Sequence, residues 1–111
     1  MNHEDGMDWI LITNTPESVK GIAIVRKGFK ARLHSHLEEE GYHFLYGTGL
    51  LSIHGESVTV NSPYFITIPS NAIHAMTPIS EFVILLFTFP KGPFEEIKYH
   101  YTDQYLQLLD S

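Results

Sequence analysis

Apolar and polar residues alternate along most of the chain in short segments, and residues that favour turns separate the segments. This pattern predicts β-strands, because successive side chains of a strand point to opposite faces of a sheet. His54-Gly55, between two such segments, predicts a two-residue hairpin turn. The predicted strands span residues 9–13, 21–25, 29–36, 40–46, 50–53, 56–60, 64–68, 73–76, 82–89 and 97–101. Many short strands joined by Gly, Pro and Asn turns indicate an all-β sandwich or barrel.

The two ends of the chain depart from this pattern. Residues 1–8 are expected to form a flexible tail, and residues 9–101 the β-barrel domain. Residues 102–111 predict a short C-terminal helix with Thr102 as its N-cap, packed on the barrel or on a second subunit. A length of 111 residues suits one domain with a single modest core.

Composition and charge narrow the function classes. The net charge of −6 argues against nucleic acid or an anionic membrane as a partner. The longest apolar run, residues 82–89, is far shorter than a membrane helix, and the acidic start of the chain does not resemble a signal peptide. The chain has no cysteine, so any metal must be held by nitrogen and oxygen. A reducing, cytoplasmic location is the expectation.

The stretch ARLHSHLEEEGYHFLYG, residues 31–47, gathers imidazoles and carboxylates within apolar sequence. On a strand, His34 and His36 point to the same side, so both can reach one point in space. A carboxylate such as Glu40 beside paired imidazoles inside a barrel is costly unless a divalent cation compensates. A further histidine, His74, follows a turn after an apolar strand.

These residues resemble the first motif of the cupins. That motif reads Gly, five residues, His-x-His, three or four residues, Glu, six residues, Gly. The matching positions are Gly28, His34, His36, Glu40 and Gly47. The spacing selects Glu40 from the three consecutive glutamates.

The second cupin motif, Gly, five residues, Pro-x-Gly-x-x-His, three residues, Asn, is matched in part. Pro69 and His74 stand at the expected places, whereas Pro63, Asn71 and Pro78 replace the two glycines and the asparagine. Asn tolerates the left-handed conformation that glycine often serves in a turn, so Asn71 is expected to preserve the loop. The two motifs cover about half of the chain.

The resemblance implies a double-stranded β-helix, a jelly-roll barrel, with a metal bound by His34, His36, Glu40 and His74. Three imidazoles and a carboxylate suit Fe, Mn, Ni, Zn or Cu. Two functional classes remain open. The first is a metal-dependent enzyme, such as a dioxygenase, isomerase, decarboxylase or lyase, acting on a small polar or carboxylate-bearing molecule. The second is a binding or sensing module for a sugar or an organic acid, without chemistry.

Two further side chains are candidates for catalysis. Tyr42 shares the face of Glu40 and is either a proton-transfer group in the pocket or simply core. Arg32 shares the face of His34 and either clamps a substrate carboxylate or points to solvent. His43, on the opposite face, and His54, in the hairpin turn, are expected to lie outside the site.

The strand at residues 82–89 is apolar on both faces, and the predicted C-terminal helix has an apolar side. Burial against a second copy of the chain would cover such surfaces, and single-domain cupins are commonly dimers. A homodimer is therefore the expected assembly, although the helix can also cap the barrel of its own chain.

Overall fold

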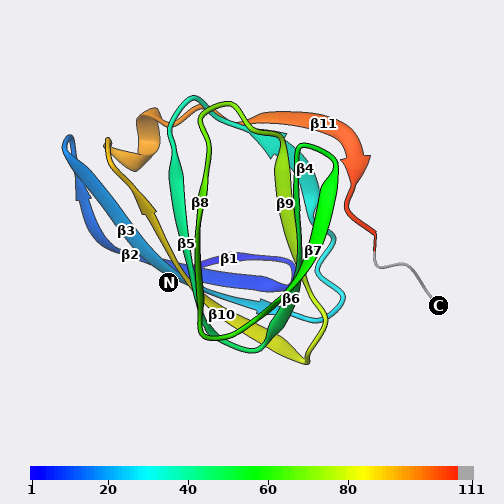
Figure 1. Ribbon diagram of the computed structural model, residues 1–111. Coiled ribbons are helices and arrows are strands. Elements are labelled where there is room, and N and C mark those ends of the chain that lie inside the picture. Colours follow the sequence, from blue (N-terminus) through cyan, green and yellow to red (C-terminus); the bar gives the residue numbers. More distant parts are fainter. Residues whose placement is uncertain (108–111) are drawn as a thin grey trace.

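The computed structural model describes residues 1–107, whose strands form two antiparallel sheets that face each other (Figure 1). The six-stranded sheet contains, in spatial order, β1 (Asn2–Glu4), β2 (Met7–Thr15), β3 (Ser18–Arg26), β10 (Phe82–Phe89), β5 (Glu40–Tyr46) and β8 (Tyr64–Ile68). The five-stranded sheet contains β11 (His100–Tyr105), β4 (Arg32–Ser35), β9 (His74–Pro78), β6 (Thr48–Ile53) and β7 (Glu56–Asn61). The predicted all-β jelly-roll architecture is confirmed.

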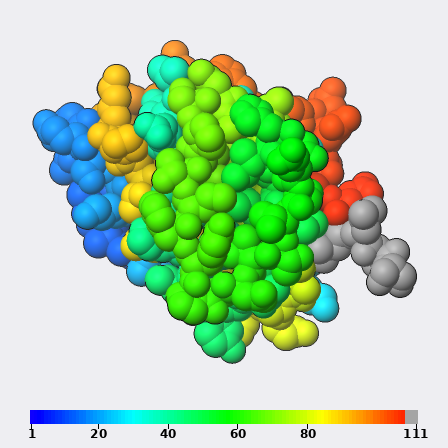
Figure 2. Space-filling model, viewed as in Figure 1, coloured from blue at the N-terminus to red at the C-terminus, as the bar shows by residue number. Residues whose placement is uncertain are grey.

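The core lies between the two sheets because the strands alternate as their sequences predict. In β10, Val83, Leu85, Phe87 and Phe89 are buried, while the residues between them are more exposed. The largest fully buried side chains include Phe44 and Leu51, from opposite sheets, together with Ile68. Residues of β6, β7 and β8, shown in green, form much of the face turned to the viewer in Figure 2. Within the described range, no helix is both long and apolar enough to cross a membrane.

Two sequence-predicted turns are confirmed by their backbone angles. His54 and Gly55 have φ values of 51° and 82°, and β6 and β7 pair on either side of them. Positive φ at both central residues is what a type I′ hairpin turn requires. Asn71 has φ 63°, so it adopts the left-handed conformation expected for the residue that replaces a glycine of the motif.

The N-terminal residues differ from the flexible tail that the sequence suggested. Residues 2–4 form β1, which pairs with β2 from Asn2 opposite Trp9 to Glu4 opposite Met7. Gly6, with φ 88°, allows the tight turn between the two strands. The turn is fastened to β3, since the Arg26 amide donates to the Gly6 carbonyl at 2.8 Å. The added strand depends on this pairing, which the local sequence does not encode.

The C-terminal residues also differ from the expectation. Residues 100–105 form the edge strand β11 instead of the start of a helix. Thr102 does make the local bond of a helix cap, because its Oγ1 accepts from the Gln104 amide at 3.1 Å, but the surrounding chain is extended. The helical element near this end is a short 3-10 helix at Phe94–Glu96. The rest of the predicted helix, residues 108–111, lies outside the described residues.

Candidate metal centre and pocket

Three strands bring the candidate ligands together. His34 lies on β4 directly opposite His74, the first residue of β9, and Glu40 begins β5 in the facing sheet. His36 follows β4, and its carbonyl accepts from the Asn71 amide at 2.9 Å. This bond ties the loop before His74 to the loop after β4. Two loops distant in sequence are thereby locked together at the site.

The three histidines are oriented in the same way. Each places Nδ1 within 2.9 Å of a backbone carbonyl two residues away: His34 on Arg32, His36 on Glu38 and His74 on Ala72. Because a carbonyl only accepts, each Nδ1 carries the proton and each Nε2 is left with a lone pair. One nitrogen from each ring lies within 4.8 Å of the others. Such backbone anchoring is typical of metal-ligating histidines.

Glu40 faces this cluster from the opposite sheet. Its Oε1 lies 3.0 Å from Nε2 of His36 and 3.4 Å from Nε2 of His74. The latter nitrogen is buried and has no hydrogen-bond partner. A carboxylate oxygen and an imidazole lone pair are both acceptors, so they approach this closely only when a proton or a cation lies between them.

The pKa values of these groups follow from their surroundings. Burial, with a smaller effect of His74, lowers the pKa of His34 to about 4, so this imidazole is neutral at pH 7. Burial disfavours the charged form of His36, but the bond to Glu40 outweighs it and raises its pKa. Burial likewise opposes ionisation of Glu40, yet the two imidazoles beside it lower its pKa overall. The ionised carboxylate and the neutral imidazoles are the forms that bind metals.

The cluster opens into a pocket of about 660 Å³ between the sheets. His34, Glu40 and Tyr42 line the pocket together with Tyr99. Burial and the Glu40 carboxylate raise the pKa of both tyrosines. The pocket therefore joins a cluster of potential metal ligands to two phenol side chains, in a volume suited to a small molecule.

The predicted site residues end up in three environments. His34, His36, Glu40 and His74 come together, and Tyr42 lies beside them, with its ring 6.0 Å from that of His74. Arg32 also lines the pocket, but its Nε donates to the Thr102 carbonyl at 2.7 Å. His43 packs on Phe65 on the outer side of β5, with ring centroids 4.2 Å apart, and His54 lies in the hairpin turn.

Sequence reasoning missed the aromatic wall of the pocket. Tyr99 and Tyr101 place their rings 5.5 Å from that of His34. Trp9 and Phe94 continue the wall, with ring centroids 5.2 Å apart. The alternation of Tyr99 and Tyr101 already implied a shared face, but nothing local showed that this face closes over His34.

The donor set fits a divalent transition metal. Each of the three imidazoles has its Nδ1 on a backbone carbonyl, so each Nε2 points into the cluster. Among residues 1–107, Nε2 of His74 is buried without a hydrogen-bond partner, and the Glu40 carboxylate faces Nε2 of His36 and of His74. Imidazole with carboxylate suits iron, manganese, nickel, copper and zinc. The order of divalent affinities by itself favours copper, so the metal that is bound depends on its supply and on the geometry of the site.

The comparisons with known proteins agree with this architecture. No protein-family model matches the chain. The chain is 29% identical over 99 residues to dimethylsulfoniopropionate lyase DddW of Ruegeria pomeroyi, a match that covers 85% of the chain and 65% of that protein. The chain thus spans less than two thirds of the length of this curated relative.

Solved structures resemble the chain more in fold than in sequence. A structure described under "Crystal structures of DMSP lyases RdDddP and RnDddQII" has a TM-score of 0.75 at 18% identity, covering 87% of this chain and 53% of that one. Salicylate 1,2-dioxygenase of Pseudoaminobacter salicylatoxidans has a TM-score of 0.77 at 15% identity, covering 91% and 30%. An RmlC-like cupin of Shewanella frigidimarina has a TM-score of 0.78 at 15% identity, covering 85% and 84%.

Two facing antiparallel sheets enclose the histidine cluster. Together with the spacing of the two motifs, the likenesses to solved structures show that the chain has the cupin fold.

Proposed function

We propose that the protein is a metal-dependent lyase that acts on a small carboxylate with an onium leaving group, of which dimethylsulfoniopropionate is the example named by its relatives. The observation that carries the proposal is the convergence of three imidazoles and the Glu40 carboxylate, of which His34 and Glu40 line a 660 Å³ pocket. The ligands would be His34, His36, Glu40 and His74. The metal would be Fe, Mn, Ni, Zn or Cu.

The reaction would be an elimination. A base removes a proton from the carbon next to the carboxylate, a carbon–carbon double bond forms, and the bond from the next carbon to sulfur breaks. Dimethyl sulfide leaves with the electron pair, and acrylate remains. A bound divalent metal would supply positive charge that holds the carboxylate, stabilises the charge that develops on it, and offsets the Glu40 carboxylate beside Tyr42.

We assign the role of base to Tyr42. It stands two residues after Glu40 on β5, so both side chains face the pocket. Tyr42 would first release its own proton to solvent, and the Oη of the resulting phenolate would then accept the proton from the substrate carbon and return it to solvent after the products leave. Tyr99, from the opposite wall, also lines the pocket, and its ring lies 5.5 Å from that of His34. The two phenols provide the titratable groups that an enzyme needs and a simple binding module does not.

The aromatic wall supports a cationic substrate group. Trp9, Phe94, Tyr99 and Tyr101 surround the pocket, and aromatic faces attract onium groups. The opposite charge at the metal end would attract the carboxylate. Aromatic faces beside a bound metal therefore suit a small zwitterion better than a sugar. That Arg32 clamps the substrate carboxylate directly stays a prediction. One of its donors is already bonded to the Thr102 carbonyl.

The test is an assay of dimethyl sulfide and acrylate from dimethylsulfoniopropionate, with protein loaded separately with each of the five metals. The wild type is expected to turn over with at least one metal. Tyr42→Phe should keep the metal and lose turnover by about 10² to 10⁴-fold, the range for general-base catalysis. His54→Asn, in the exposed hairpin turn, is the control, because Asn tolerates the positive φ of this position. If metal-loaded wild type binds the compound without converting it, the alternative of a binding or sensing cupin for a small organic acid is correct.

We also propose that the assembly is a homodimer formed by the outer face of the six-stranded sheet. An apolar row crosses five strands in register, from Ile10 on β2 to Phe65 on β8, through Ile22, Leu86 and His43. Ile10 is 44% exposed and Phe65 52%. The row has no net charge to repel its own copy, which suits an isologous contact.

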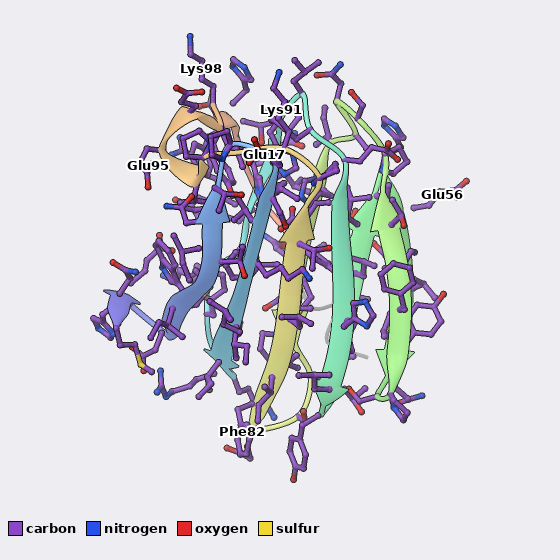
Figure 3. All side chains as sticks on the ribbon, turned by 90° about the vertical axis from the view of Figure 1, so that its left-hand side faces the viewer. Glu17, Glu56, Phe82, Lys91, Glu95 and Lys98 are labelled. Carbon is purple, nitrogen blue, oxygen red and sulfur yellow. The ribbon has the colours of Figure 1, made fainter. Side chains whose placement is uncertain are left out.

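Figure 3 shows this face with the charged side chains Glu17, Lys91, Glu95 and Lys98 gathered at one end and Phe82 at the other. Light scattering at micromolar concentration should give the mass of a dimer. Leu86→Glu, in the middle of the row, should give a monomer, and Val58→Glu, on exposed β7, should not. A monomeric wild type would refute the dimer. A cytoplasmic location also stays a prediction, supported by the absence of cysteine.

A further inference from the structure

We propose that Arg32 is a positioning residue that fastens β11 to β4 and thereby holds Tyr99 and Tyr101 against His34. The role concerns the shape of the pocket wall, and only its effect on turnover depends on the proposed function. Arg32 is then not required to touch the substrate.

The pairing of β11 with β4 is interrupted where Arg32 acts. Tyr101 lies opposite His34, but the next paired residue of β11 is Tyr105, opposite Arg32. Three residues of β11, 102–104, therefore face a single residue of β4, and the regular ladder of backbone hydrogen bonds is lost there. In this gap Arg32 Nε donates to the Thr102 carbonyl at 2.7 Å. A side chain thus supplies the contact that the backbone cannot make.

The same guanidinium contacts the aromatic wall. Arg32 Cζ lies 5.4 Å from the centre of the Tyr101 ring. Tyr101 is stacked on Tyr99, with ring centroids 6.0 Å apart and an interplanar angle of 17°. Both rings lie 5.5 Å from that of His34. A continuous series of contacts therefore runs from Arg32 through the two tyrosines to a proposed metal ligand.

Within residues 1–107, few other contacts hold β11 in place. It is an edge strand that pairs with β4 alone, and five of its six residues are exposed, so hydrophobic burial contributes little. Beyond the interrupted pairing, the Leu106 amide donates to the Ala31 carbonyl at 2.8 Å, and Asp103 Oδ1 lies 4.0 Å from Arg32 Nη2. An exposed edge with few contacts opens easily unless it is fastened. The two contacts of Arg32 are therefore a large share of its attachment.

Lysine cannot replace arginine here. The planar guanidinium donates in its own plane to Thr102 while its face lies over Tyr101. Lysine has the charge but neither the directed Nε donor nor the flat surface. Arg32→Lys therefore separates geometry from charge.

The first test measures hydrogen exchange and needs no substrate. In Arg32→Lys and Arg32→Gln, peptides covering residues 99–106 should exchange about tenfold or more faster than in the wild type, while peptides of β10 stay unchanged. Zinc stoichiometry should also stay unchanged. Arg26→Lys, which alters an exposed arginine paired with Asp8 instead, is the matched control. Unchanged exchange at residues 99–106, or an equal increase in β10, would overturn the proposal.

The second test uses turnover of dimethylsulfoniopropionate. Arg32→Lys should raise KM about 5- to 20-fold and leave kcat within about twofold, because the wall binds substrate and Tyr42 is untouched. Tyr101→Ala should have the same effect, and the double variant should add little, since both changes release the same wall. Additive effects, or a loss confined to kcat, would overturn the proposal. If the wild type has no turnover, the proposed function fails and the exchange result alone decides the role of Arg32.

Discussion

Metal binding should raise the melting temperature by an amount that grows with metal concentration. A ligand that binds the folded state alone stabilises it by about 1.4 kcal/mol for each tenfold increase in free ligand above its dissociation constant. For 111 residues, the entropy of unfolding near the melting temperature is about 230 cal/mol/K. The expected rise is therefore about 6 °C for each tenfold increase in metal.

His74→Ala should shift the rise in melting temperature to higher metal concentrations. A structural metal site with four ligands binds with roughly 10 to 16 kcal/mol, so one ligand contributes about 2.5 to 4 kcal/mol. Losing it weakens binding by about 10² to 10³-fold, and the melting curve at a given metal concentration should fall by about 12 °C or more. The variant also loses buried volume, which lowers the melting temperature without metal. The metal dependence, not the starting value, is therefore the criterion.

The assay is a thermal melt followed by circular dichroism, over a concentration series of each of the five metals, with the metal-stripped protein as reference. His54→Asn is the matched control because this histidine lies in the exposed hairpin turn, away from the cluster, and Asn tolerates its positive φ. The ligand assignment would be refuted if the melting temperatures of the wild type and of His74→Ala began to rise at the same metal concentration. So would a wild type whose melting temperature does not respond to any of the five metals.

Three further predictions concern the fold. Contacts with His3 and Arg26 lower the pKa of Asp8 below 3.8 in the folded protein. The stability that Asp8→Asn loses should therefore be constant above about pH 5 and shrink as the pH falls through the pKa of Asp8 in the folded state. Urea unfolding from pH 7 to pH 3 measures this loss. Gly21→Ala should cost about 1 to 3 kcal/mol in urea unfolding, because a Cβ there would lie 2.2 Å from the Phe87 ring; an unchanged midpoint would contradict this packing. Leu51→Ala, fully buried, should cost about 2 to 5 kcal/mol by the same measurement, and a loss under 1 kcal/mol would show that the site is not core.

The local sequence was sufficient to predict those elements whose conformation depends only on neighbouring residues. Short apolar runs bounded by turn residues located β3 and β10, and His54-Gly55 between two such runs predicted the hairpin turn. The ligand candidates were found for the same reason. His34 and His36 stand two residues apart on an extended segment, so they share a face whatever the rest of the chain does.

The two ends of the chain could not be predicted in this way. Residues 2–4 and 100–105 are strands because they pair with β2 and β4, and edge pairing depends on which surfaces the finished barrel offers. The cap-forming preference of Thr102 is real, but an extended strand satisfies it equally well. The aromatic wall could not be predicted for the same reason, because Tyr99 is brought next to His34 only by the pairing of β11 with β4.

The central claim is that three histidines and Glu40 hold a metal, and metal content tests it most directly. Protein purified without added metal or nickel affinity should be analysed for its elements beside the His34→Ala, His74→Ala double variant. The account predicts near-stoichiometric iron, manganese, nickel, copper or zinc in the wild type and its loss in the variant. Wild-type protein that carries no metal and takes up none on titration, or a variant that retains the same metal, would contradict the account.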